Sequence, residues 1–517
     1  MGIEKDQLET FLGLFHPEEE RQKYAFHLFE LFESIPDLPD EDYRELLARI
    51  ATDASDNARI LAAYLACGIW FGKQIDTSLL PSLQSNESWK TLAVQRLLLD
   101  EPGPASNPHR NDFHVAAGAF GLLSGFGYPD VAEWVLERSA KLHARYFEEN
   151  DLRERRLDQT WFLAIGHFAI SILFLAAAQR GVISSSRVQN GRVGRNGNEY
   201  LFQLANRTFS DAILTFDMNF NALPFGKFAM EQIRDRIYLV SDVVEKIDRE
   251  VDPEATGILA LDEATRSRLR AWVLEQGQDP TKPIVTVHVR TDGYRSNVPS
   301  GMRSWNIKAL FSSIRMLVGE GCLVVRLGDP SMPRIAEFEG FIDYAHSDAR
   351  SPELDIAFVA EAAFHIGSSS GMSLVPILFG TPCLMLNWYM RVHAGPWGRR
   401  CWTVFKKITD LQTGEPVQDF ERLRVLGMAE YHFVHERYGA KLENLSEEEI
   451  LRAVERFMTE EVSNRRTDVK RLPGPRNFIF DQAGKMVECD IYGIPGGGAR
   501  GFSHKPEGYS ISEREAG

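Results

Sequence analysis

The sequence predicts an α/β protein with a parallel sheet over residues 281–410 and an all-helical N-terminal segment. Between residues 284 and 388, short runs rich in Val, Ile and Leu alternate with helical segments, an order typical of βαβ units. Clusters of Gly, Ser and Asp follow these runs, as expected for loops at strand ends. Hydrophobic residues make up 44% and charged residues 25% of the 517 residues, which suits a globular chain with a sizeable core.

Each expected strand of this sheet is a short apolar run bounded by turn-forming residues. We expect strands at 284–289, 323–327, 341–344, 364–366 and 383–386. Helices are expected between them at 306–318, 354–362 and 372–379. The first of these helices carries a single apolar stripe, as a helix that covers a sheet does.

The rest of the chain divides into four segments. Residues 1–155 have apolar residues at helical spacing and are expected to form a helical domain, either a plain bundle or a short repeat array. Residues 156–280 begin with an expected strand at 160–164, a Gly-His turn and a helix at 168–179. Residues 411–463 add helices, one of them started by a Ser446–Glu449 capping box. Residues 464–517 are polar and glycine-rich, which favours a loosely structured tail.

Charge and cysteine content exclude several classes of function. The formal net charge is −15, whereas a nucleic-acid surface needs clustered cations. The five cysteines are scattered, so neither a metal site nor a disulfide framework is indicated. No signal-peptide pattern opens the chain, and the apolar stretch 161–178 is better explained by a strand, a turn and a buried helix than by a membrane span. We therefore expect a cytoplasmic protein.

The segment Gly367–Gly371 reads Gly-Ser-Ser-Ser-Gly and lies between an expected strand and an expected helix. Ligands of doubly wound sheets bind at the carboxyl ends of strands, and the free N–H groups of a helix start favour an anion. The alternative is a serine-rich helix cap without a ligand. No Lys follows the last glycine, so this is not a Walker P-loop. The candidate anion-binding residues are Ser368, Ser369, Ser370 and Gly371.

Polar residues also follow the first two expected strands. Strand alternation places His288 and Arg290 on one face, and the guanidinium fork of Arg290 suits a pyrophosphate. Asp292 is a candidate to orient that arginine, although a structural salt bridge explains the pattern as well. After the second strand, Asp329 either accepts a hydrogen bond from a ribose or base, or only shapes the turn. Three such loops at one sheet edge indicate a binding site there.

The sequence resembles known glycosyltransferases at these segments. Residues 288–292 (His-Val-Arg-Thr-Asp) resemble the HxRRxD signature of the α1,6- and protein O-fucosyltransferases, and Ser368–Ser370 resemble their phosphate-binding serine segment. A closer resemblance is to bacterial glycosyltransferases of surface-polysaccharide and O-antigen gene clusters. It is carried by residues 161–167, 326–332, 341–347 and 367–376 and spans about residues 158–410.

The resemblance implies a GT-B fold, in which two Rossmann-like domains face each other. Residues 156–280 would form the acceptor-side domain and residues 281–410 the domain that binds a nucleotide sugar, without a bound metal or a further cofactor. His167 would be the base that accepts the proton of the acceptor hydroxyl, with Asp292 as a second candidate. A buried histidine that caps the helix is the alternative for His167.

The resemblance leaves the donor sugar open. Thr291 stands where the fucosyltransferase signature has its second arginine, and Gly293 stands where it has the aspartate. The sequence thus predicts transfer of a sugar from a nucleotide-diphosphate donor to a glycan, lipid-linked glycan or protein acceptor, in the cytoplasm or at the inner face of the membrane. Two alternatives remain: a protein-glycosylating enzyme that recruits its acceptor through the N-terminal helices, and a non-catalytic helical interaction protein.

Overall fold

The computed structural model describes the larger part of the chain. The described residues are 18–53, 58–75, 98, 109–135, 137–138, 155–157, 164–179, 186–190, 197–209, 213–215, 228–230, 237–239, 257–291, 302–389, 400–429, 431–462, 476–490 and 493–495. The candidate Asp292 lies outside these ranges.

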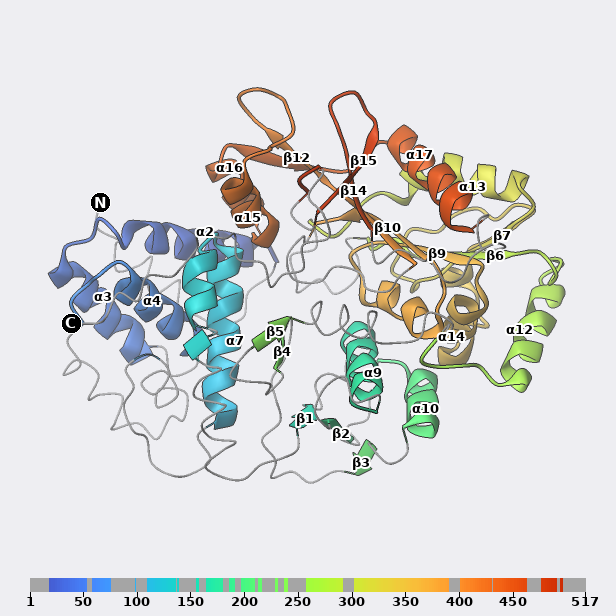
Figure 1. The fold of residues 1–517 in the computed structure, drawn as a ribbon, viewed down its shortest axis with the longest axis horizontal. Helices are drawn as coiled ribbons and strands as arrows, with labels where there is room; N and C mark the ends of the chain where they lie inside the picture. Colours follow the sequence, from blue (N-terminus) through green and yellow to red (C-terminus); the bar gives the residue numbers. More distant parts are fainter. Residues whose placement is uncertain are drawn as a thin grey trace.

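An eight-stranded, mostly parallel sheet dominates the right half of Figure 1. Its spatial order is β15-β14-β11-β10-β9-β6-β7-β8, and only the β14–β15 pair is antiparallel. The strands are β6 (Ile284–Val287), β7 (Leu323–Arg326), β8 (Phe341–Ile342), β9 (Phe364–Gly367), β10 (Cys383–Trp388), β11 (Cys401–Phe405), β14 (Arg476–Phe480) and β15 (Met486–Cys489). The first six of these, numbered along the chain, lie in the order 3-2-1-4-5-6, which is the order of dinucleotide-binding sheets.

Helices cover both faces of this sheet. On one face lie α13 (Phe311–Gly319) and α17 (Glu447–Phe457), which share a core with alternate residues of the central strands. On the other face lie α12 (Glu263–Glu275) and α14 (Pro352–Glu361). The expected helix at 306–318 begins as a 3-10 turn, η4 (Ile307–Leu310), and the expected helix at 372–379 is a pair of 3-10 turns, η6 (Gly371–Leu374) and η7 (Pro376–Phe379). The Ser446–Glu449 capping box starts α17.

A smaller parallel sheet precedes the large one in the chain. It consists of β1 (Arg155–Leu157), β2 (Ser186–Asn190) and β3 (Ile213–Thr215), in that order. Helices α9 (Ile165–Gln179) and α10 (Glu199–Thr208) connect these strands, while β4 (Phe228–Met230) and β5 (Ile237–Leu239) form a separate hairpin. The expected Gly-His turn is wrong, because Gly166 and His167 lie inside the first turn of α9.

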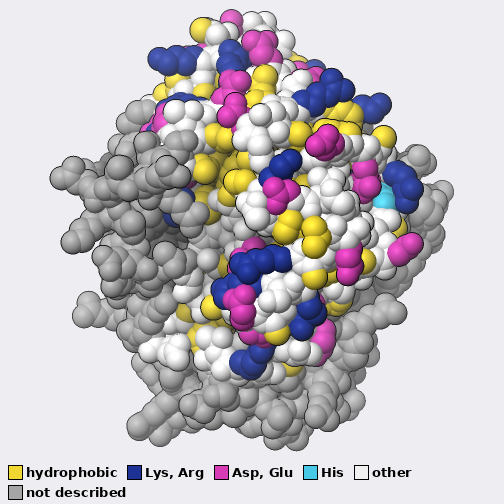
Figure 2. All heavy atoms as spheres, turned by 90° about the vertical axis from the view of Figure 1, so that its right-hand side faces the viewer, with side chains coloured by type: hydrophobic (Ala, Val, Ile, Leu, Met, Phe, Trp, Pro, Cys, Tyr) yellow, Lys and Arg dark blue, Asp and Glu magenta, His cyan; other side chains and the backbone are white. Residues whose placement is uncertain are grey.

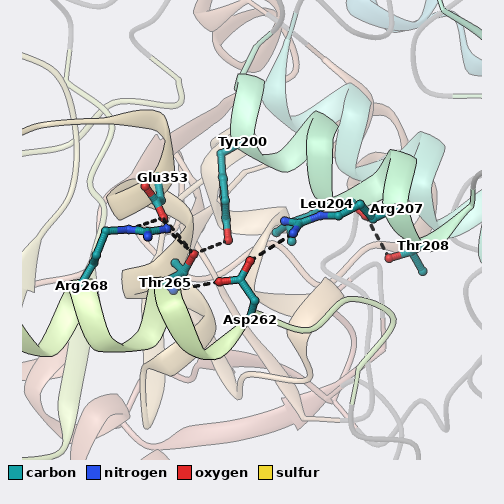
Figure 3. A network of polar contacts seen from close by, with 8 residues as sticks. All are labelled: Tyr200, Leu204, Arg207, Thr208, Asp262, Thr265, Arg268 and Glu353. Atoms are coloured by element: carbon teal, nitrogen blue, oxygen red, sulfur yellow. Dashed lines mark hydrogen bonds and ion pairs between the residues drawn. The ribbon is translucent and has the colours of Figure 1, made fainter.

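Helices α9 and α10 do not stand apart from the large sheet. Both belong to the same hydrophobic core as α12, α14 and one face of that sheet. A polar network also ties α10 to α12 and α14 (Figure 3): the Thr265 hydroxyl contacts the Tyr200 hydroxyl at 2.8 Å and donates to Glu353 at 2.8 Å, and Arg268 also donates to Glu353. The Asn198 side chain donates to the Pro352 carbonyl at 2.9 Å.

The described N-terminal elements are helices: α2 (Glu18–Ser34), α3 (Asp40–Asp53), α4 (Ala58–Trp70) and α7 (His109–Gly125), with further helical residues at 129–135. They pack around a core of their own, which α16 (His432–Arg437) joins through Val434. The helices lie at the left of Figure 1, next to α15 (Phe420–Met428) and α16.

The C-terminal part of the chain differs from the sequence-based expectation. Residues 476–480 and 486–489 were expected within a loose tail, but they form β14 and β15 of the large sheet. The alternating apolar residues Phe478 and Phe480 are buried against Trp402 and α17, which explains their strand conformation. A two-stranded antiparallel sheet pairs β12 (Lys407–Asp410) with β13 (Ala440–Glu443). Strand β13 lies within residues 411–463, where only helices were expected.

The face of the molecule on which α12 lies carries mixed charges. Figure 2 shows Lys and Arg side chains interspersed with Asp and Glu over the described part of this face. Ion pairs such as Arg266–Glu361, with 2.9 Å between Nε and Oε1, contribute to this pattern. Across the described ranges, no helix is both long enough and apolar enough to span a membrane.

Candidate active site at the carboxyl edge of the sheet

The strand order defines where a ligand would bind. The chain runs outward from β6 through β7 to β8, then returns to β9 on the other side of β6 and runs outward through β10 and β11. The order therefore reverses between β6 and β9. In open α/β sheets, ligands bind outside the carboxyl ends of the strands at such a switch point. The residues that directly follow β6 and β9 are those that the sequence marked as anion-binding candidates.

Direct contacts join these two loops. The Arg290 N–H donates to Ser368 Oγ at 3.0 Å, and the His288 N–H donates to the Ile366 carbonyl at 2.9 Å. Arg290 and Ser368 are both buried. The structure thus brings His288, Arg290 and the serine segment together at the switch point.

The three serines of the loop act differently from a helix cap. Ser368 Oγ accepts from Arg290, and Ser369 Oγ accepts from the Tyr389 N–H at 3.4 Å, so these two hydroxyls connect the loop to the ends of β6 and β10. Ser370 occupies the position before η6 but makes no side-chain capping hydrogen bond. Ser370 is also half-buried. Among the serines of this loop it is therefore the one whose position best fits contact with a ligand. Ser373 Oγ fixes the loop by donating to the Ser368 carbonyl at 2.8 Å.

The first turn of α9 touches this loop, backbone against backbone. A Cβ added to Gly166 would lie 2.5 Å from the Gly371 Cα, and one added to Gly371 would lie 2.8 Å from the Gly166 nitrogen. Both residues must be glycine for α9 to approach this closely. Since His167 follows Gly166 directly, it is held beside the serine loop, on the opposite element. The Gly-His pair is visible in the sequence, but its contact with the serine loop could not be predicted from the sequence.

His288 is held as a neutral imidazole. Burial lowers its pKa to about 4, against the charge of Asp329, which raises it. Burial also lowers the pKa of His365 to about 3, and His365 Nδ1 lies 3.0 Å from the Thr286 hydroxyl on the same face of the sheet. At neutral pH His288 is therefore a hydrogen-bonding group near the site, not a cation for a phosphate.

Asp329 shapes its own turn and also contributes charge. Its carboxylate accepts from the Ser331 N–H at 2.9 Å, and its carbonyl accepts from the Met332 N–H at 3.1 Å. Gly328 before it has a φ of 151°, which favours glycine. The turn-forming alternative for Asp329 is thus what the described contacts show, and a ribose contact stays a prediction.

Two of the motifs that carry the family resemblance meet in a buried ion pair. Arg326, at the end of β7, pairs with Asp343 at 3.0 Å, and both side chains are almost fully buried. Asp343 also contacts His346 at 3.0 Å and accepts from the Ile335 N–H at 2.8 Å. These contacts fix the segment between β7 and the end of β8. Their role in the described structure is to shape the sheet edge beside the site.

Several polar residues of this edge were not marked by the sequence. Arg303 donates from Nε to the Tyr389 hydroxyl at 3.1 Å, and Lys406 directly follows β11 with its side chain buried. Ser304 and Thr291 are buried nearby. The signal for Lys406 was a lysine at the end of the apolar run 401–405, but that run was not expected to be a strand of the same sheet.

The described residues include neither an exposed cysteine nor a group that could bind a metal ion. All five cysteines are free thiols and are buried, and burial raises the pKa of Cys67 and Cys322. Within the ranges that the structure describes, there is no group of three or more His, Cys, Asp or Glu side chains arranged to hold a metal ion.

Comparisons with known proteins give a distant likeness. No protein-family model matches the sequence, and no curated protein matches it. Among solved structures, the chain is similar to that of a glycosyl transferase family 9 protein from Veillonella parvula, at 11% identity and a TM-score of 0.32, over 59% of this chain and 96% of that one. Because a likeness this weak carries no functional argument, the function has to be inferred from the site.

Proposed function

We propose that this protein is a glycosyltransferase that moves a sugar from a nucleotide-diphosphate donor to an acceptor hydroxyl, by a metal-independent GT-B-type arrangement. The observation that carries the proposal is the junction at the switch point, where the Arg290 N–H bonds Ser368 Oγ at 3.0 Å and the Gly166–Gly371 contact holds α9 against the same loop. One Rossmann-type sheet edge and the start of a helix from a second parallel β-α unit therefore meet at a candidate anion site.

The chemistry follows from these positions. When the glycosidic bond to the donor phosphate breaks, negative charge grows on the leaving diphosphate. Arg290, the loop N–H groups and Ser370 would stabilise that charge. His167, held across the contact, would accept the proton of the acceptor hydroxyl. Asp292 and Asp329 remain proposed contributors, the first as a second base and the second as a donor-binding group. The acceptor is proposed to be a glycan or lipid-linked glycan of the cell surface.

Donor binding tests the first half of this proposal. UDP, GDP, CDP and dTDP, each with a corresponding sugar, are titrated against the full chain while the melting temperature is followed. At least one nucleotide should raise it, and Arg290→Ala should weaken that nucleotide about tenfold or more, as expected for loss of a charge-assisted contact. Arg315→Ala removes an exposed arginine of α13 and should leave binding unchanged. If no nucleotide shifts the melting temperature, the donor site is wrong.

Transfer tests the second half. With the donor identified, His167→Ala should retain donor affinity but lower the rate of nucleoside diphosphate release in an acceptor panel by about 10²–10⁴-fold, the usual contribution of general base catalysis. A variant that binds donor and still transfers at the rate of the native protein would remove His167 from the mechanism. Loss of binding together with transfer would instead make it a binding residue.

A further inference from the structure

Buried polar groups at the sheet edge extend beyond the switch point, to the end of β11. Lys406 directly follows this strand and is 3% exposed. Its Nζ donates to the Ser304 carbonyl at 3.5 Å. Trp305, the residue after Ser304, donates its N–H to the Arg290 carbonyl at 3.2 Å. The 304–305 peptide therefore connects the lysine after β11 with the arginine after β6.

Two hydroxyls in this region have no hydrogen-bond partner among the described residues. Ser304 Oγ and Thr291 Oγ1 are fully covered, on residues that are 7% and 9% exposed, and neither forms a hydrogen bond within the part of the chain that the structure describes. A buried hydroxyl without a partner is costly, so such groups point to a ligand that completes them. Thr291 adjoins Arg290, and Ser304 accepts from Lys406 through its carbonyl.

The charges in this region favour an anion as that ligand. Arg290 and Lys406 are both buried cations at the same sheet edge. Burial is the main cause that lowers the pKa of the nearby His432, and the charge of Lys406 lowers it further. Two cations with two hydroxyl donors match a group with many acceptor oxygens, as in a phosphate. A carboxylate offers only two oxygens.

We infer that Lys406, Ser304 and Thr291 form a second phosphoryl subsite beside the Arg290–serine loop site, so that Lys406 holds the terminal phosphate of a nucleoside diphosphate. This inference rests on the proposed function. The first phosphate lies at Arg290 and Ser370. The second lies toward the ends of β10 and β11, and Lys406 neutralises the charge that the leaving diphosphate gains as the sugar departs.

The test compares each nucleoside diphosphate with its monophosphate by isothermal titration calorimetry on the full chain. For the nucleotide that binds best, the native protein should prefer the diphosphate by about tenfold or more. Lys406→Met should reduce this preference about tenfold while the monophosphate affinity stays within about threefold, because the variant loses only the charged hydrogen bond to the terminal phosphate. Lys308→Met removes an exposed lysine four residues beyond Ser304 and should change neither affinity.

Milder variants separate binding from folding. Ser304→Ala should lower the diphosphate preference by about three- to tenfold, as for a neutral hydrogen bond, and Lys406→Arg should retain most of it because the charge remains. These two variants decide the matter if circular dichroism shows that Lys406→Met is unfolded. An unchanged preference in folded Lys406→Met, or in Ser304→Ala if that variant has to decide, overturns the subsite alone. A native protein that binds no nucleotide overturns the proposed function, and the subsite with it.

Discussion

At the scale of single residues, the neutral state of His288 sets a pH dependence. Its pKa is lowered to about 4 in the folded protein, mainly by burial, whereas an unfolded histidine titrates near 6.5. Between these values the unfolded chain binds the proton and the folded chain does not. The contribution of His288 to stability is therefore fully present above pH 6.5 and falls as the pH drops toward 4. His365, with a pKa of about 3, acts in the same direction.

We expect His288→Gln to remove part of this dependence, because glutamine does not titrate. The free energy of unfolding, measured by urea at pH 7, 6 and 5, should fall less steeply for the variant. The full difference near pH 4 is about 3 kcal/mol, at about 1.4 kcal/mol for each pH step. The other groups titrate in both proteins, so the difference in slope reports His288 together with its effect on the pKa of His365. His27→Gln, on the surface of α2, is the control, and equal slopes for His288→Gln and the native protein would contradict the prediction.

Residue types at strand ends were the most informative part of the sequence. Strand alternation alone placed His288 and Arg290 on one face. The position of the serine segment between an expected strand and an expected helix placed it in a loop. The burial of His288 and the partners of Ser368 and Ser369 could not be predicted, because they depend on which strand lies beside β6. Lys406 was missed for the same reason: its place at this edge arises from a strand pairing, β10 with β11, that local sequence does not specify.

At the scale of elements, the contact of α9 with the serine loop is the feature on which the site depends. Gly166→Ala adds a methyl group whose position lies 2.5 Å from a backbone carbon of Gly371, and backbone yields less readily than a flexible side chain. The helix must therefore move away from the loop. We expect a loss of about 1–3 kcal/mol of stability, typical of overpacking, and a larger proportional loss of sugar transfer than of nucleotide affinity, since His167 is displaced.

Gly121→Ala provides the matched control for that substitution. Gly121 lies within α7, and a Cβ added there would meet nothing within 4 Å. Alanine should keep or raise stability there, because glycine costs up to about 1 kcal/mol inside a helix. Chemical denaturation and donor titration of both variants check the prediction. A Gly166→Ala protein as stable and active as Gly121→Ala would show that α9 does not need this close approach.

Element boundaries show where local sequence stops being sufficient. The apolar stripe of 306–318 and the capping box at Ser446 were enough to place helices. The start of α9 was misjudged, because a Gly-His pair is typical of a turn, yet here the glycine is needed for contact with another loop. The segment 476–489 looked like a tail because β14 pairs with residues over seventy positions away, at β11, and short local windows contain no sign of that partner.

At the scale of the whole molecule, the N-terminal helices are joined to the sheet domain through α15 and α16. Arg424 pairs with Asp130 at 2.7 Å, and Arg437 pairs with Glu33 at 2.8 Å. The Phe433 ring lies 5.4 Å from that of Phe26, measured between ring centroids. Removal of residues 1–150 would expose this apolar contact. A loss of acceptor recruitment could then not be distinguished from a loss of folding. Point substitutions at the junction are the cleaner way to ask what the helices do.

Phe433→Ala should loosen this junction without altering the donor site. Phe433 packs against Phe29 and Tyr431 as well as Phe26, and truncation of a partly buried phenylalanine costs about 2–3 kcal/mol, somewhat less than in a full core. Amide hydrogen exchange should accelerate in α2 and α7 but not in α12 and α14, because the latter belong to the core of the large sheet. Nucleotide affinity should stay within about twofold, since the ring of Phe433 packs on aromatic side chains and takes part in none of the hydrogen bonds proposed for the donor.

Phe338→Ala is the control for that experiment. Phe338 stacks on Phe341, which belongs to the core of the large sheet, and is 42% exposed. Its loss should leave exchange in α2 and α7 unchanged. Equal acceleration in all four helices after Phe433→Ala would mean that the chain unfolds as one unit. Faster exchange limited to α2 and α7, with unchanged nucleotide affinity but weaker acceptor transfer, would give the N-terminal helices a role in holding the acceptor.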